Sequence, residues 1–293
     1  MRRVFINARS NVRSGWKALL FMLAFTLVLL PFVLPIHGVP LLQRFPWWLN
    51  SGWVTVAILV GLTFLFLKME KRPFRSSGLA VDLPWSRECL WGFLIGAGLI
   101  GLAAAMLWAS GAVVLHHQAN TNAMVLLSGA LIFLPAAISE ELIFRGYPFQ
   151  RIVEGTGPWP ALLVFAFFFA LTHWGNPHMS GQIKVMASLN IFLAALLLGL
   201  SYLRTGRLGL PIGIHFGWNW AQGTLLGFGV SGGQIQSYFR PVFQSDRLWL
   251  TGGPFGLEAS LPGVLVCAVM MLILVRWKPI RQSNQDASIN RKE

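Results

Sequence analysis

The sequence predicts an all-α protein, a polytopic membrane bundle of about eight transmembrane helices. The chain has 293 residues, of which 55% are hydrophobic and only 11% are charged, and its mean hydropathy is +0.61. Soluble domains usually carry about 25% charged residues because their surfaces face water. Apolar runs near the roughly 20 residues that a spanning helix needs recur along the whole chain. Lipid is therefore the expected solvent.

Eight apolar segments define the predicted spans, at residues 16–36, 51–68, 89–110, 122–144, 158–174, 185–203, 208–228 and 261–277. Turn signals and charged residues separate them, and the EGTGP sequence at 154–158 predicts a tight turn between two spans. The Gly-rich segment 229–260 is the longest break. We expect one membrane domain over 16–277, a basic tail at 1–15 and a polar tail at 278–293.

The net charge of +13 follows the predicted topology. Lysine and arginine concentrate between alternate spans, as in cytoplasmic loops that face anionic lipid. We therefore expect both termini in the cytoplasm and no nucleic-acid partner. The two cysteines, Cys89 and Cys267, have no spacing typical of a disulfide framework or a metal site.

Two adjacent acids mark the fourth span. Glu140 and Glu141 lie in the apolar run LIFLPAAISEELIF, where a charge costs about 2.5–3.5 kcal/mol on insertion scales and usually has a function or a partner. Arg145 follows Glu141 by four residues, in the favourable order for a helical ion pair. Glu140 points about 100° away around the helix. We expect Arg145 to hold Glu141 while Glu140 faces the bundle; the alternative is that both acids only flank the inner end of the span.

Two further spans carry histidines. His173 ends the fifth span, and Glu140 lies a similar number of residues before the EGTGP turn. In an antiparallel hairpin both side chains would lie roughly 20–25 Å from that turn. His215 and Asn219 stand one helical turn apart in GIHFGWNW, where they can supply two donors to one oxygen. The alternatives are an interfacial histidine for the first and an interhelical polar clamp for the pair.

These residues resemble three motifs of the CPBP membrane peptidases, which comprise the CAAX prenyl proteases and bacterial relatives linked to bacteriocin processing or self-immunity. The resemblance covers about 80 residues, and the corresponding core of this chain spans 122–228. The motifs stand complete and in order: Glu140-Glu141-x-x-x-Arg145, Phe169-x-x-x-His173 and His215-x-x-x-Asn219.

The resemblance implies a glutamate-dependent intramembrane endopeptidase whose cavity opens toward the cytoplasm. Glu140 would be the general base and His173 would hold and activate the water, while His215 and Asn219 would form the oxyanion hole. The expected location is a bacterial inner or plasma membrane. The expected partners are membrane lipids and a peptide or protein substrate, cleaved near its C-terminus and in some cases prenylated.

Glu141 and Arg145 would order the site by the same resemblance. We expect no cofactor, and the alternative is a zinc ion on Glu140, His173 and His215, because two histidines and one carboxylate can bind zinc. No H-E-x-x-H motif occurs, which argues against zincins. The sequence Gly229-Val230-Ser231-Gly232-Gly233 matches G-x-S-x-G, but it lies in the Gly-rich break and not between a predicted strand and a predicted helix, the context that a serine-hydrolase elbow needs. Two other functions stay open: a non-catalytic scaffold or bacteriocin-immunity protein, and a proton-coupled transporter.

Overall fold

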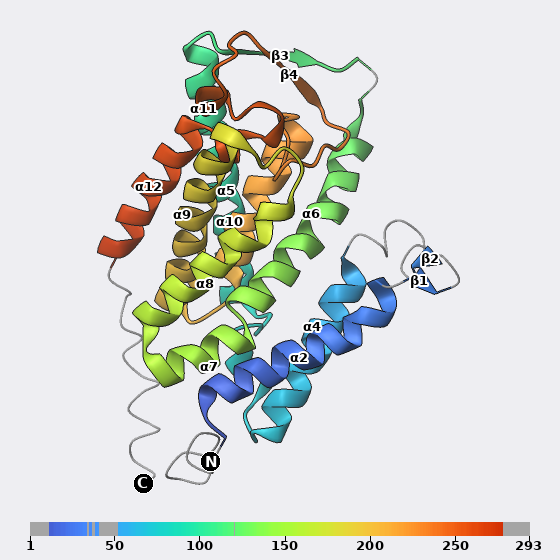
Figure 1. Cartoon of the computed structure of the whole chain (residues 1–293), viewed down its shortest axis with the longest axis vertical. Coiled ribbons are helices and arrows are strands. Elements are labelled where there is room, and N and C mark those ends of the chain that lie inside the picture. The colour runs from blue at the N-terminus through green and yellow to red at the C-terminus, as the bar shows by residue number, and fades with distance from the viewer. Residues whose placement is uncertain (1–11, 34, 37–38, 41–51, 120, 278–293) are drawn as a thin grey trace.

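The computed structural model describes residues 12–33, 35–36, 39–40, 52–119 and 121–277, and in these ranges the chain is mostly helical (Figure 1). Each of the eight predicted spans corresponds to a helix. In chain order these helices are α2 (Ser14–Val33), α4 (Trp53–Met69), α5 (Leu83–Ala109), α6 (Ala123–Phe144), α8 (Pro158–Thr172), α9 (Gly181–Thr205), α10 (Gly209–Trp220) and α12 (Leu261–Arg276). Both predicted tails lie largely outside the described residues.

Several helices have the length and composition of membrane spans. Within the described ranges, four segments are long and apolar enough to cross a bilayer: Leu83–Ala109, Ala123–Thr156, Pro158–Gly175 and Gly181–Thr205. Three shorter apolar helices accompany them, at Ser14–Leu30, Trp53–Met69 and Leu261–Arg276. Successive long helices run in alternating directions through the bundle (Figure 1). The prediction of a helical membrane protein is confirmed at this level.

Two helices differ from the prediction. The seventh predicted span, 208–228, is regular only as α10 and continues as one π-helical turn, Ala221–Leu225. The connection between the fourth and fifth spans is no simple turn, because it contains a separate helix, α7 (Tyr147–Thr156). Pro148 occupies the first turn of α7, where its missing N–H is harmless. This helix lies across one end of the bundle (Figure 1).

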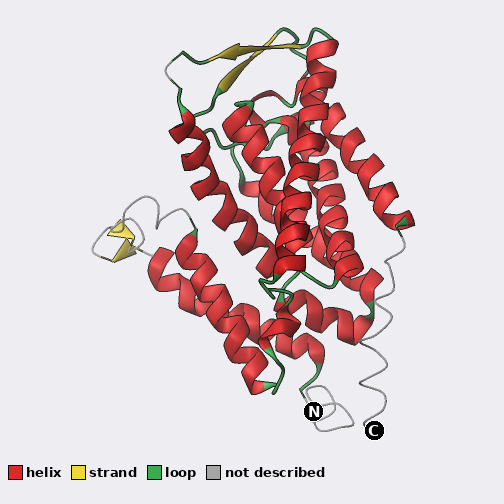
Figure 2. Ribbon diagram, turned by 180° about the vertical axis from the view of Figure 1, so that it is seen from behind, coloured by secondary structure: helices red, strands yellow, loops and turns green. Residues whose placement is uncertain are grey.

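Short strands close the other end of the bundle. β3 (Val113–His117) follows α5 and pairs antiparallel with β4 (Phe239–Phe243), with Val113 opposite Phe243 (Figure 2). The ladder satisfies backbone groups in connections that the hydropathy pattern shows only as breaks. A second small pair joins β1 (Pro35–Ile36) to β2 (Val39–Pro40).

The helices α5 and α10 are in backbone contact along their length. Glycines spaced four residues apart occur on both helices, Gly92 and Gly96 on α5 and Gly213 and Gly217 on α10. A Cβ atom on Gly213 would collide with the carbonyl of Cys89. Small residues at this spacing allow close helix approach in membranes, so this packing fixes α10 and the residues it carries.

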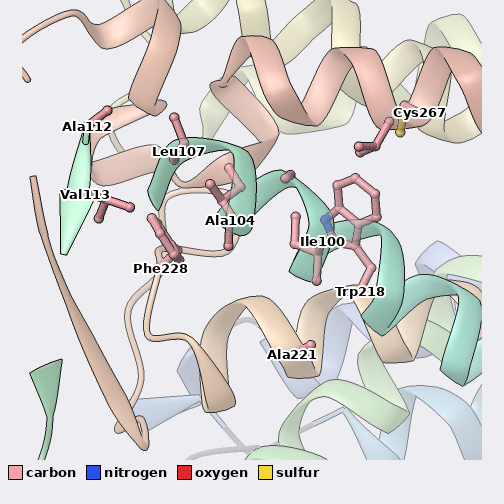
Figure 3. Packing of buried hydrophobic residues seen from close by; sticks show 12 residues of the cluster. Ile100, Ala104, Leu107, Ala112, Val113, Trp218, Ala221, Phe228 and Cys267 are labelled. Atoms are coloured by element: carbon pink, nitrogen blue, oxygen red, sulfur yellow. The ribbon is translucent and has the colours of Figure 1, made fainter. Parts of the chain in front are cut away.

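An apolar core surrounds the C-terminal half of α5. It joins Ile100, Ala104 and Leu107 of α5 to Trp218 of α10 and Cys267 of α12 (Figure 3). Each of these side chains is less than 10% exposed. Three helices contribute to this cluster. It therefore packs the C-terminal end of α10 and the N-terminal half of α12 against α5.

The predicted break 229–260 is not a surface loop throughout. After β4, the chain passes through α11 (Leu248–Thr251) and two 3₁₀ turns, Gly253–Phe255 and Leu257–Ala259. Most of residues 251–260 are buried. Gly256 adopts φ 111°, and a Cβ at this position would collide with the carbonyl of Gly229. The segment therefore folds back against the bundle.

Candidate active site

A buried carboxylate joins the first and third motifs. Glu141, on α6, is fully buried, and its Oε1 atom lies 3.0 Å from Nη1 of Arg145. The same oxygen lies 2.9 Å from Nδ1 of His215 on α10. Nη2 of Arg145 donates to the carbonyl of Ala195 on α9 at 2.8 Å. The predicted Glu141–Arg145 ion pair is thus confirmed, and it is part of a network across three helices.

The hydrogen bond between His215 and Glu141 indicates which ring nitrogen of the imidazole carries a proton. An ionised carboxylate accepts only, so Nδ1 of His215 carries the proton of this bond. Nε2 then points to the other acid, at 3.7 Å from Oε2 of Glu140. This Glu140 oxygen is buried without a hydrogen-bond partner among the described residues. A buried unpaired carboxylate oxygen is typical of a position that receives a water molecule or a substrate group.

His173 caps the C-terminus of α8 and is held from one side. Its Nδ1 atom lies 2.7 Å from the carbonyl of Phe169, one turn earlier, so Nδ1–H is the donor and Nε2 keeps a free lone pair. The Phe169 ring packs 4.8 Å from the ring of His173 and 6.3 Å from that of His215. The guanidinium of Arg145 lies 4.9 Å from the same ring. Phe169, which the second motif also contains, thus packs against the Arg145 guanidinium and against both imidazoles.

Four predicted catalytic residues line one cavity of about 70 Å³, which is room for several water molecules. They are Glu140, His173, His215 and Asn219. Asn219 is 9% exposed and stands one turn after His215, directly before the π-helical turn. Such turns are frequent at functional sites. Apolar side chains form much of the remaining wall: Phe169, Ile191, Ala194, Leu197, Leu198, Ile214 and Trp218.

The predicted continuous hairpin around residues 154–158, which would place Glu140 and His173 at equal depth, is wrong, because α6 ends at Phe144 and α7 lies between α6 and α8. Both side chains nevertheless reach the same cavity. α8, which carries His173 at its end, packs against α7 and α9, and this packing brings His173 to the cavity that Glu140 of α6 lines.

One acid of the cavity escaped the sequence analysis. Glu258 lies in the buried 3₁₀ turn before α12 and lines the same cavity as Glu140. It lies in the predicted break 229–260, outside every apolar run long enough to span a membrane. Hydropathy therefore gave no reason to select it. The available signal was a single acid between glycines and apolar residues, GGPFGLEASLPG. Asn190 of α9 donates to the main-chain carbonyl of Glu258 at 3.0 Å.

The donor set does not fit a metal ion. Within the described ranges, no three His, Cys, Asp or Glu side chains come together in a metal-binding arrangement. The alternative zinc ligands Glu140, His173 and His215 line one cavity, and the hydrogen bonds at Nδ1 leave Nε2 of both histidines as possible ligand atoms, but the three side chains do not come together closely enough to hold an ion. We therefore derive no step through a metal.

The site of this helical bundle is thus an internal cavity that combines carboxylate, imidazole and amide groups with apolar side chains. Residues 122–221 match the family model of the Rce1-like type II CAAX prenyl endopeptidases, and the chain carries a domain of this protease family. Membership implies an intramembrane protease that acts on protein substrates. No curated protein and no solved structure shows significant similarity to the chain.

Proposed function

We propose that this protein is an intramembrane endopeptidase that hydrolyses peptide bonds near the C-terminus of membrane-associated or lipidated proteins. The observation that carries the proposal is the convergence of Glu140, His173, His215 and Asn219 on one largely apolar cavity. Preorganised donors in such a site are worth about 2.7–4 kcal/mol each when they face a developing oxyanion. A protein that used these helices only for binding would not need this combination of a carboxylate, a free imidazole nitrogen and an amide.

The proposed reaction needs no covalent intermediate. Glu140 takes a proton from a water molecule that Nε2 of His173 helps to hold, and the water oxygen attacks the peptide carbonyl carbon. The carbonyl oxygen becomes an oxyanion that Asn219 and Nε2–H of His215 stabilise. The C–N bond then breaks, and Glu140 passes its proton to the leaving nitrogen. Donation from Nε2 requires His215 to be doubly protonated, since Nδ1–H is already bound to Glu141.

Glu141 and Arg145 order the site in this proposal. Both side chains are at most 3% exposed, and both are bound within the protein, so neither is free to meet a substrate. Their contribution is to hold His215 in one orientation, which is the usual task of groups behind a catalytic residue.

The proposed topology has eight membrane spans and both ends of the domain on the cytoplasmic side of a bacterial inner or plasma membrane. The basic residues support it: Lys17, Arg72, Arg151, Arg204 and Arg276 belong to segments at or toward the α7 end of the bundle (Figure 1). The excess of lysine and arginine marks that end as cytoplasmic.

The test uses purified protein in detergent and peptides with or without a prenylated cysteine near the C-terminus. We expect wild type to cleave at one bond, and Glu140→Gln and His173→Ala to lower kcat by at least about a hundredfold. Asp246→Asn, which removes an exposed carboxylate outside the cavity, is the matched control and should cleave like wild type. Full activity in Glu140→Gln would exclude the proposed mechanism, and no cleavage by any of the proteins would favour a scaffold.

A further inference from the structure

Glu258 places a second carboxylate in the cavity, apart from the three motifs. It is 9% exposed and belongs to the 3₁₀ turn Leu257–Ala259, ahead of α12. Buried carboxylates are rarely kept without a partner, because desolvation of the charged form is costly. Among the described residues, no lysine or arginine forms an ion pair with Glu258. The burial of this carboxylate therefore needs an explanation.

The carboxylate of Glu258 is anchored through only one of its oxygens. Oε2 accepts the backbone N–H of Ser231 at 2.6 Å and the Ser231 hydroxyl at 3.0 Å. Ser231 has φ 49°, a left-handed conformation that is uncommon for a residue other than glycine and that persists where surrounding contacts enforce it. Among the described residues, Oε1 of Glu258 receives no hydrogen bond. One oxygen is thus fixed and the other is available to a ligand.

A second unpaired acceptor lies beside it. Asn190 is 1% exposed and uses its Nδ2 donor on the main-chain carbonyl of Glu258. Its Oδ1 atom is buried without a hydrogen-bond partner in the described part of the chain. Asn190 and Glu258 line the same cavity. This pole of the cavity therefore offers acceptors and lacks a donor.

The charged groups around the cavity also favour a cationic ligand. Its lining contains Glu140 and Glu258 but no lysine or arginine. With Glu141 and Arg145 behind it, three carboxylates face one guanidinium and the doubly protonated His215 of the proposed mechanism, which leaves one net negative charge when His173 is neutral. Burial raises the pKa of Glu258, against the opposing effects of His173, the Ser231 hydrogen bonds and His215. A cation bound at Oε1 would stabilise the ionised form.

We propose that Glu258, anchored by Ser231 and flanked by Asn190, is a specificity-determining residue that binds a cationic side chain of the substrate peptide. A lysine or arginine near the scissile bond supplies the missing donors and offsets the negative charge. A terminal carboxylate finds no lysine or arginine in this lining, so we place it outside the cavity. This inference rests on the proposed peptidase function, because it assumes that a peptide occupies the cavity.

Binding tests the inference separately from hydrolysis. Fluorescent peptides that differ at one position, with lysine, norleucine or glutamate, are titrated onto purified Glu140→Gln protein, and the position is moved along both sides of the scissile bond. At one position, lysine should bind about tenfold more tightly than norleucine, the size expected for one charge-assisted hydrogen bond. Glutamate should bind most weakly. The double variant Glu140→Gln/Glu258→Gln should lose the preference for lysine and keep its affinity for norleucine.

The controls separate this role from a structural one. Glu140→Gln/Asp246→Asn removes an exposed carboxylate and should keep the preference for lysine, whereas Glu140→Gln/Ser231→Ala should weaken it. Equal affinity for lysine and norleucine at every position, the same preference after Glu258→Gln, or no binding of any peptide would overturn the inference. Cleavage by wild type without a lysine preference would leave the peptidase function standing. A lysine preference without cleavage would remove the peptidase function and leave the cation site.

Discussion

The Nδ1 atom of His215 lies 2.9 Å from Oε1 of Glu141, and this buried contact connects α10 to α6. Because Arg145 donates to the same oxygen at 3.0 Å, the position of the imidazole depends on an ion pair that no substrate reaches. Two neighbouring glutamates thus have different environments. Glu141 is held within the protein, while Glu140 faces the cavity with an unpaired oxygen.

Loss of one partner of the buried ion pair should destabilise the protein. Arg145→Met leaves Glu141 charged and buried beside His215, and we expect a loss of about 3–5 kcal/mol in the free energy of unfolding. The double variant Glu141→Gln/Arg145→Met should recover part of it, because no uncompensated charge remains. Unfolding in detergent, followed by tryptophan fluorescence, measures both.

The control for this prediction is an exposed ion pair. Glu154 pairs with Arg72 at 2.6 Å, and these two side chains are 38% and 39% exposed. Glu154 also pairs with the buried Arg151 at 2.9 Å, but Arg151 keeps its ion pair with Glu70, so Glu154→Gln should cost no more than about 1 kcal/mol. A loss as large as that of Arg145→Met would contradict the importance of burial.

Removal of the amide of Asn219 should affect turnover more than binding. Asn219→Ala should lower kcat by about 10²–10³ with a small change in KM, as for loss of one oxyanion donor. Steady-state kinetics on a cleavable peptide measure both constants. Gln118→Ala removes an amide that binds Ser237 near the β3–β4 pair and should leave both constants unchanged. A rise in KM alone for Asn219→Ala would assign this residue to substrate binding.

The glycine contact between α5 and α10 should tolerate no added methyl group. Gly213→Ala forces a Cβ against the carbonyl of Cys89, and overpacking of this kind costs about 1–3 kcal/mol. The shift of α10 should also displace His215 and lower kcat. Gly98→Ala on α5 has free space around the new methyl group and should be neutral or slightly stabilising. Equal effects of the two variants on thermal unfolding would argue against this close contact.

Stability should depend on the ionisation of Glu70 at the end of α4. Burial favours the neutral acid, but hydrogen bonds from Tyr147 and Lys17 and the charge of Arg151 hold the pKa of Glu70 below its ordinary value of 4.5. A lowered pKa stabilises the folded state above 4.5, and this contribution disappears as the pH falls below it. Wild type should therefore unfold less readily than Glu70→Gln at neutral pH. A difference that stays constant through the acid range would contradict the pKa shift.

The helices could be predicted because hydropathy and membrane thickness constrain them. All eight predicted spans coincide with helices, usually within a few residues. The short helix α7 was missed because its sequence, YPFQRIVEGT, is polar on one side and is followed by strong turn residues. The β3–β4 pair was missed because the partners are separated by more than 100 residues, and local patterns contain no such pairing.

The motif residues of the cavity could be predicted for a related reason. Glu140, His173, His215 and Asn219 lie in apolar runs, where a polar group stands out. Glu258 could not be found in this way, because it lies in a segment whose burial depends on tertiary contacts such as the approach of Gly256 to Gly229. Its role therefore became visible only in the folded chain.

The central claim is that Glu140 makes this protein a protease, and the most direct test compares new protein termini in membranes. Cells express wild type or Glu140→Gln at matched levels, and mass spectrometry identifies the termini in each membrane fraction. We expect a set of new C-termini, close to the original ends of membrane-associated proteins, that occurs with wild type and is absent with Glu140→Gln. The same termini at the same abundance with both proteins would contradict the claim.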